Sequence, residues 1–233
     1  MAGDLTRTKV SVQTPLRVRF SGRFVRIIVG PENQEWTIHE RLLCNASDYF
    51  ADALAGPSYE EAIFLPEHNS DVFTLFVDWL YQSNLARPPV FQIEHCDDLS
   101  KFLKLAIMAN KFLVPDLENG AIAAIYIYLK DNDVSHPDVK LEFAQVSYVF
   151  NHTNPGSGLR RLLCHHILAH LFEGSFRDPE VKEDWEYHLQ KDQEIAAELF
   201  NAQFERFISH RGRLFPFRLA ELSSYQLQPF DEM

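Results

Sequence analysis

Short segments near the N-terminus have the apolar, β-branched composition that is typical of strands. They are Val10–Val12, Arg17–Phe20, Phe24–Val29, Trp36–Ile38 and Ala62–Leu65. Residues 30–35 between the third and fourth segments have turn composition, so Trp36–Ile38 is predicted to be a returning strand. The pattern therefore predicts a small sheet in the first third of the chain.

From residue 41 onward, apolar residues recur at steps of three and four, which predicts amphipathic helices. The predicted helices before residue 131 cover residues 41–54, 72–80, 99–113 and 115–130. The first is interrupted near Asn45, and Ser47 is predicted to cap a second helix there. Pro115 stops one helix and begins the next at a tolerated first-turn position.

The second half of the chain has no strand-like segment in its pattern. Helices are predicted over 139–150 and 159–172, with a linker at 131–137 and a break at 151–158. At Asp178-Pro179-Glu180, a cap, a first-turn proline and an early acid predict one long helix that runs through Phe207. Because strands come early and do not alternate with helices, the fold class is predicted to be α+β, with an all-helical C-terminal region packed on the first unit.

Four segments of the first half resemble the BTB/POZ domain, in that family's order and at its spacing. They are VRIIVG (Val25–Gly30), IHERLLCNASDYFADAL (Ile38–Leu54), LPEHNSDVFTLFVDWLYQSNL (Leu65–Leu85) and LAIMANKFLVPDLEN (Leu105–Asn119). The resemblance predicts an N-terminal extension at 1–16, a BTB/POZ domain at 17–130 and a helical C-terminal region at 138–233.

The resemblance implies a small β-sheet capped by helices and a non-enzymatic protein-protein interaction module or scaffold, with no cofactor. The family is usually dimeric, and some members are substrate adaptors of cullin-based ubiquitin ligases. The expected partners are therefore other proteins, among them a second copy of the chain or a cullin. A short helical tail without Kelch, MATH or zinc-finger segments is similar to fungal BTB proteins.

Two positions depart from the family's pattern. Members that dimerise through a charged pocket usually carry Asp before the VxIxVG strand, whereas Phe24 occupies that position here, after Arg23. Cullin-binding members tend to carry a hydrophobic-x-Glu element in the loop after the WLY helix. In this chain Ile93-Glu94 lacks the intervening residue, and Pro88-Pro89 stiffens the loop. Neither the usual dimer pocket nor cullin binding is supported residue by residue.

The charge of the chain narrows the range of its partners. The chain of 233 residues carries 22 basic and 33 acidic side chains, a formal charge of −11, which repels phosphate backbones and anionic lipid. A small basic cluster of Arg211, Arg213 and Arg218 with His210 is more typical of a solvated end. The longest apolar run, Ala121–Leu129, is far short of the roughly 20 residues that span a bilayer. We expect no nucleic-acid and no membrane partner.

The cysteines and the N-terminus favour an intracellular protein, cytoplasmic or nuclear. Cys44, Cys96 and Cys164 lie far apart and are odd in number, which is typical of reduced thiols. The first residues contain no apolar segment of a secretory signal.

An enzyme is the alternative from another functional class, and two histidine motifs bear on it. His39-Glu40 begins like a zinc-protease helix, but the second histidine of that motif is replaced by Leu43. His166 and His170 share a helix face and are candidate metal ligands. A metal would need a third ligand, which the sequence does not identify, so the preferred interpretation is a pair of histidines at a packing seam.

A thiol nucleophile at His95-Cys96 has no support either, because catalytic Cys-His pairs meet across a fold and not along the chain.

What remains is surface for protein partners. Val90, Phe91, Gln92 and Ile93 follow two prolines and are predicted to form an exposed edge strand that pairs with another chain. Leu42 and Tyr49, on the first predicted helices, are further candidate contact residues.

Overall fold

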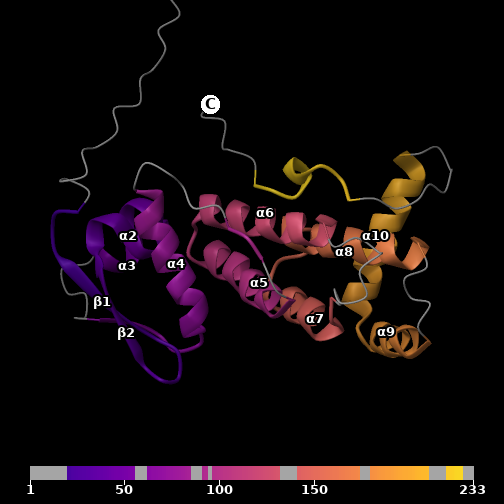
Figure 1. The fold of residues 1–233 in the computed structure, drawn as a ribbon, viewed down its shortest axis with the longest axis horizontal. Coiled ribbons are helices and arrows are strands. Elements are labelled where there is room, and N and C mark those ends of the chain that lie inside the picture. The colour runs from indigo at the N-terminus through magenta and orange to yellow at the C-terminus, as the bar shows by residue number, and fades with distance from the viewer. Residues whose placement is uncertain are drawn as a thin grey trace, which may run out of the picture.

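A computed structural model describes most of the chain. The described residues are 20–55, 62–84, 91–93, 96–131, 141–173, 179–209 and 219–227. Within them the fold is α+β, with a small sheet at one end and helices over the rest of the length (Figure 1). The predicted fold class is confirmed. The predicted strands at 10–12 and 17–19 lie outside the described residues.

The sheet has the strand order β2-β1-β3. Its strands are β1 (Phe24–Val29), β2 (Gln34–His39) and β3 (Ala62–Leu65). β1 and β2 form an antiparallel hairpin, in which Gly30 and Asn33 take the positive φ angles of 76° and 54° that close the turn. β3 returns parallel to β1, with Ile27 opposite Ile63.

Helices cover one face of this sheet. Along β1, the side chains of Val25, Ile27 and Val29 are buried, while Phe24 and Arg26 point to the exposed face. The covering helices are α2 (Glu40–Ala46), α3 (Asp48–Leu54) and α4 (Ser70–Ser83). The junction of α2 and α3 follows the prediction, because the Ser47 hydroxyl accepts a hydrogen bond from the Phe50 N–H at 3.2 Å.

A helical hairpin joins the sheet to the tail. It consists of α5 (Cys96–Lys111) and α6 (Pro115–Asp131). The tail contains α7 (Phe143–His152), α8 (Gly158–Glu173), α9 (Pro179–Lys191), α10 (Gln193–Ser209) and the 3₁₀ turn η2 (Leu222–Ser224). In Figure 1 the α5–α6 hairpin lies between the sheet and the tail, and α9 and α10 form the far end.

One hydrophobic core runs through the described part of the molecule. Its buried side chains extend from Val25 in the sheet to Tyr225 near the C-terminal end. Phe112 stands at an aromatic centre, with its ring 4.8 Å from Phe50 and 5.6 Å from Phe76. The α7–α10 tail therefore shares its core with the α5–α6 hairpin, as expected for a tail packed on the first unit.

The single long helix predicted from 178 to 207 is wrong, because two helices occupy that stretch. The chain breaks at Asp192, whose carboxylate accepts a hydrogen bond from the Ile195 N–H at 3.2 Å. A carboxylate in that position caps a backbone N–H in the first turn of a new helix, which would otherwise lack a partner. It therefore favours the start of a second helix over continuation of the first.

The predicted edge strand is also wrong for residues 91–93, which have no strand structure, while Val90 lies outside the described residues. Phe91 and Ile93 are half-buried against the core, and Gln92 is exposed. The Phe91 ring meets Phe102 edge-on at 5.5 Å. Packing on α5, and not pairing with a strand, determines the conformation of this segment.

Candidate interaction surface

The outer face of α10 carries four large apolar side chains that water reaches. Phe200 is 67% exposed, Phe204 52%, Phe207 42% and Ile208 61%. At about 100° per residue, these positions fall within an arc of about 100° on the helix and span roughly 12 Å along it. We call these four residues the α10 stripe.

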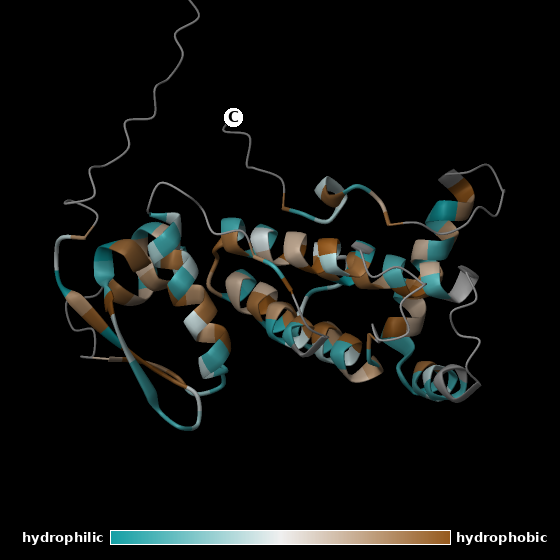
Figure 2. Ribbon diagram, in the orientation of Figure 1, coloured by the Kyte–Doolittle hydropathy of each residue, from teal (hydrophilic) through white to brown (hydrophobic). Residues whose placement is uncertain are grey.

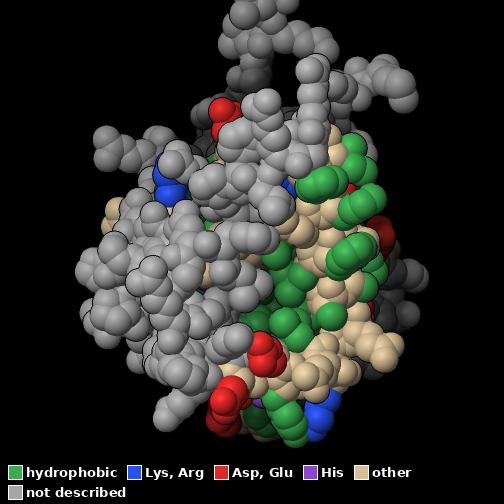
Figure 3. All heavy atoms as spheres, turned by 90° about the vertical axis from the view of Figure 1, so that its right-hand side faces the viewer, with side chains coloured by type: hydrophobic (Ala, Val, Ile, Leu, Met, Phe, Trp, Pro, Cys, Tyr) green, Lys and Arg blue, Asp and Glu red, His purple; other side chains and the backbone are tan. Residues whose placement is uncertain are grey.

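The stripe is a continuous ridge. The Phe200 and Phe204 rings lie one turn apart and nearly parallel, with centroids 6.0 Å apart and an interplanar angle of 11°. Figure 3 shows apolar side chains gathered on this end of the molecule, with acidic side chains at the lower end of the patch. Single exposed apolar residues are ordinary on protein surfaces, but a contiguous patch marks an interaction surface.

Hydrophobicity alone does not decide which face of α10 points outward. Apolar residues occur around much of the helix, and Figure 2 shows brown positions recurring along it. Ile195 and Leu199, which lie on the other side, are buried in the core. Phe200, Phe204 and Phe207 belong to the same apolar pattern of the helix as Leu199, yet all three are exposed.

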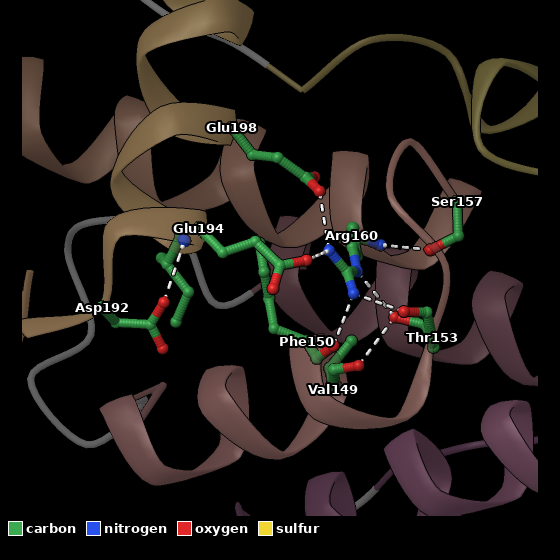
Figure 4. A network of polar contacts seen from close by, with 9 residues as sticks. Val149, Phe150, Thr153, Ser157, Arg160, Asp192, Glu194 and Glu198 are labelled. Carbon is green, nitrogen blue, oxygen red and sulfur yellow. Dashed lines mark hydrogen bonds and ion pairs between the residues drawn. The ribbon is translucent and has the colours of Figure 1, made fainter.

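A buried arginine fixes the rotation of α10. Arg160, in the first turn of α8, is 2% exposed and forms ion pairs with Glu194 and Glu198 of α10 (Figure 4). The Arg160–Glu198 pair measures 2.7 Å from Nη1 to Oε1. Turning α10 to bury the stripe would pull both carboxylates away from the guanidinium.

The same guanidinium also closes the end of α7. It donates to the backbone carbonyls of Phe150 and Thr153, and its Nε donates to Thr153 Oγ1 at 2.9 Å. The centroid of the Phe150 ring lies 4.5 Å from Arg160 Cζ. Burial lowers the pKa of Arg160, but the hydrogen bonds and charges of the two carboxylates raise it above its ordinary value overall. Arg160 therefore stays charged while it joins α7, α8 and α10.

A C-terminal segment, residues 219–227, lies across α6 and α8, and we call it the strap (Figure 1). Tyr225 is 1% exposed, and its hydroxyl accepts from the Ala220 N–H at 2.8 Å and lies 2.7 Å from His165 Nδ1. Asn119 of α6 bonds both backbone groups of Leu227, at 2.7 and 3.0 Å. Gly158 lets the strap approach α8, since a Cβ there would lie 1.8 Å from the Tyr225 carbonyl oxygen.

The candidate metal pair lies at a packing seam of α8. His166 is buried, and its ring centroid is 4.2 Å from that of His170. Within the described part of the chain, no three His, Cys, Asp or Glu side chains are placed to hold a metal ion. Burial, with a smaller effect of His170, lowers the pKa of His166 to about 3.

This low pKa predicts that stability falls as the pH drops. The unfolded chain takes up a proton near pH 6.5, whereas folded His166 resists protonation down to about pH 3, so the stabilisation present above pH 6.5 is lost between these values. Between pH 7.0 and about pH 5.8, His166 should account for a loss of about 1 kcal/mol. Urea unfolding at both pH values should show a weaker pH dependence in His166→Leu. Equal slopes in the variant and the wild type would contradict the prediction.

The two cysteines whose side chains are described are free thiols. Burial raises the pKa of Cys164 to about 12, and Glu198 adds to the increase. Burial also raises the pKa of Cys44. Neither is a thiolate at neutral pH, so neither has the activation that a nucleophile needs. The side chain of Cys96 lies outside the described residues.

The two remaining candidate contact residues, Leu42 and Tyr49, differ in exposure. Leu42 is 0% exposed in the core, so its prediction as a contact residue is wrong: α2 turns that side chain inward. Tyr49 is 38% exposed and stacks on Phe112 at 5.4 Å, and its role in binding stays a prediction. Residues 85–90 and 94–95, which hold the cullin-related loop positions, lie outside the described residues.

No sequence motif marks Arg160 as a functional residue, although an arginine at the start of an apolar helix is a visible signal. None of the helices that the structure describes has the length and apolarity needed to span a bilayer.

Comparison with protein-family models gives no match, and comparison with curated proteins gives none either. The resemblance to the BTB/POZ domain therefore rests on the four sequence segments.

Proposed function

We propose that the chain is a non-enzymatic protein-interaction module of BTB/POZ type, with its partner surface on the helical tail. The observation that carries the proposal is the α10 stripe, four contiguous apolar side chains that remain 42–67% exposed. Interface cores are enriched in aromatic side chains, and the stripe has that composition.

The arrangement of the first half supports the family part of the proposal. A hairpin, two short helices, a third strand and a further helix form a small sheet with helices on one face. This is the architecture that the sequence resemblance implies. The raised pKa values of Cys44 and Cys164 count against a thiol-dependent enzyme, which is the alternative from another class.

The exposed phenylalanines of the sheet lie apart from one another and make weaker candidates. Phe24 and Phe64 on the outer face of the sheet are 55% and 58% exposed. They lie on different strands, and the register pairs Phe64 with Ile28, four residues along β1 from Phe24. These two residues therefore serve as matched controls for the stripe, with equal exposure at the other end of the molecule (Figure 1).

A photo-crosslinking residue in place of Phe204 tests the proposal. When the full chain is irradiated in its own cells, the Phe204 position should give discrete higher-mass adducts, because the stripe contacts a partner. The same residue in place of Phe64 should give few or none. Equal adduct patterns at the two positions, or none at Phe204, would contradict the proposal. Light scattering in line with size exclusion, with and without a cullin N-terminal domain, tests the adaptor alternative on the same protein.

A further inference from the structure

The strap is held on α6 and α8 by one deeply buried side chain. Tyr225 is the only residue of the described segment 219–227 whose side chain is buried, and the others are half-buried or exposed. Its ring centroid lies 6.0 Å from that of Tyr126 on α6 and 5.5 Å from that of His165 on α8. We call the surface under the strap, with Asn119 and Tyr126 of α6 and Gly158, Arg161 and His165 of α8, the strap site.

Leu222 supplies a second, shallower anchor. It begins the 3₁₀ turn η2, in which side chains three positions apart lie above one another. Leu222 and Tyr225 have this spacing, and Leu222 is half-buried against the hydrophobic core. The strap site therefore takes two side chains from the strap, an apolar residue and a tyrosine three positions later.

The strap site distinguishes tyrosine from phenylalanine. The Tyr225 hydroxyl accepts from the Ala220 N–H at 2.8 Å, and its oxygen lies 2.7 Å from His165 Nδ1. Burial, with Arg206 and Arg161 adding to it, lowers the pKa of His165 to about 4, so the imidazole is neutral at pH 7. A neutral imidazole can accept the hydroxyl proton, and a phenylalanine would leave that acceptor without its bond.

The other contacts of the strap site are made to the backbone of the strap. Arg161 Nη2 donates to the Ser224 carbonyl at 2.8 Å, and Asn119 bonds both the N–H and the carbonyl of Leu227. Every residue except proline offers these groups, so such contacts hold a peptide whatever its side chains are. Backbone hydrogen bonds that give affinity, together with pockets for a few side chains, are a general mode of peptide recognition.

These contacts do not depend on the covalent link between the strap and the helices. They join residues that lie 60 to 108 positions apart in the sequence, and a separate chain with the same groups can make each of them. The hydrogen bonds at Asn119 and Arg161 to the strap backbone are exposed to water. A segment with one buried side chain and exposed backbone bonds belongs to the part of a fold that opens most easily.

We propose that the strap site is a peptide-binding site for a partner segment that carries an apolar residue three positions before a tyrosine, and that the strap occupies this site until such a segment displaces it. The strap site and the α10 stripe lie on different elements. The inference therefore goes beyond the proposed function and neither stands nor falls with it.

Three fluorescent peptides test the chemistry of the occupant on the full chain with Tyr225→Ser, a change in the strap that leaves the strap site intact. The first peptide has the sequence of residues 218–229. The second keeps only its leucine and tyrosine at the positions of Leu222 and Tyr225, with Ala or Gln elsewhere, and the third is the first with phenylalanine for tyrosine. Fluorescence anisotropy should show that the first two bind within about threefold of each other, and that the third binds about tenfold more weakly.

The wild-type chain should bind the first peptide at least about tenfold more weakly than Tyr225→Ser does, because the tethered strap competes at a high effective concentration. Leu227→Pro is a second way to open the site, which keeps the test decisive if Tyr225→Ser does not fold. It removes the N–H that Asn119 Oδ1 accepts, and Leu227 is 43% exposed, so it leaves no cavity.

A variant of the strap site locates the binding. Asn119→Ala, added to Tyr225→Ser, removes both bonds to the peptide backbone and should weaken the first peptide about tenfold. The matched control is Asn151→Ala, an exposed asparagine of α7, which should leave the affinity within about twofold. Circular dichroism of the two double variants should match that of Tyr225→Ser.

Each outcome decides for or against the inference. Equal binding to the wild type and to the opened variants, or binding that ignores Asn119→Ala, places the peptide elsewhere and overturns it. No binding of the first peptide to either opened variant also overturns it. If the first peptide binds and the second does not, the site recognises only the strap of this chain, and the inference about a partner fails. Crosslinking at Phe204 tests the α10 stripe separately in every case.

Discussion

Replacing Arg160 with methionine is expected to lower the free energy of unfolding by about 3–5 kcal/mol, because it leaves the partly buried Glu198 carboxylate and two backbone carbonyls without their cationic donor. The guanidinium is 2% exposed and serves two carboxylates and two backbone carbonyls. Folded domains are stable by only about 5–15 kcal/mol, so this loss approaches the whole free energy of unfolding of a weakly stable protein. Urea unfolding followed by circular dichroism measures it.

Three companion variants make that result specific. Arg160→Lys keeps the positive charge but lacks the planar guanidinium with its several N–H donors. It should therefore recover less than half of the free energy of unfolding that Arg160→Met loses. Adding Glu198→Gln to Arg160→Met should recover part of the loss, because it removes a carboxylate that has lost its partner. Lys101→Met breaks an exposed 3.2 Å pair with Asp98 and should cost no more than about 1 kcal/mol. An Arg160→Met protein as stable as Lys101→Met would refute the role given to Arg160.

The substitution Gly158→Ala is expected to displace the strap and to cost about 1–3 kcal/mol. A Cβ at this position would lie 1.8 Å from the Tyr225 carbonyl oxygen and 2.8 Å from its carbon, and both are backbone atoms. The strap must then move away from α8, which breaks the contact between Tyr225 and His165. Hydrogen exchange should become faster in 219–227, with the sheet unchanged.

The same substitution at another helical glycine provides the control. At Gly120 in α6, the nearest atoms to an added Cβ are those of the Phe91 ring, at 3.5 Å, which is an ordinary contact. Gly120→Ala should therefore stabilise the protein by about 0.5–1 kcal/mol through helix propensity alone. If Gly158→Ala leaves exchange in the strap unchanged, the close approach of the strap does not depend on this glycine.

Local patterns predicted most of the elements. The Ser47 cap, the first-turn proline of α6 and the strands β1 and β3 depend on residues close together in the sequence, and the structure has all of them. The parallel pairing of β1 with β3 depends on contacts across some 35 residues, and no local pattern encodes it.

The exposure of the α10 stripe was not predictable either, because it too depends on contacts between residues far apart in the sequence. The apolar period of α10 indicates a helix, but it does not say which side meets the core. That side is determined by Glu194 and Glu198, which follow Arg160 by more than 30 residues in the sequence. Likewise, Val90–Ile93 had strand composition, but the contact of Phe91 with Phe102 on α5 decided the conformation of residues 91–93.

Tyr225 of the strap is buried beside His165 of α8, and this has a consequence for synthesis on the ribosome. The strap closes over α8 only after the chain has been made beyond that tyrosine, about 50 residues after α8 ends. At translation rates of about 5–20 residues per second, the strap site on α8 stays open for roughly 3–10 s. During that interval His165 and the neighbouring apolar side chains are accessible to chaperones. Pulse proteolysis of stalled nascent chains should find α8 more sensitive when the chain stops at Ser209 than when it has emerged past Leu227.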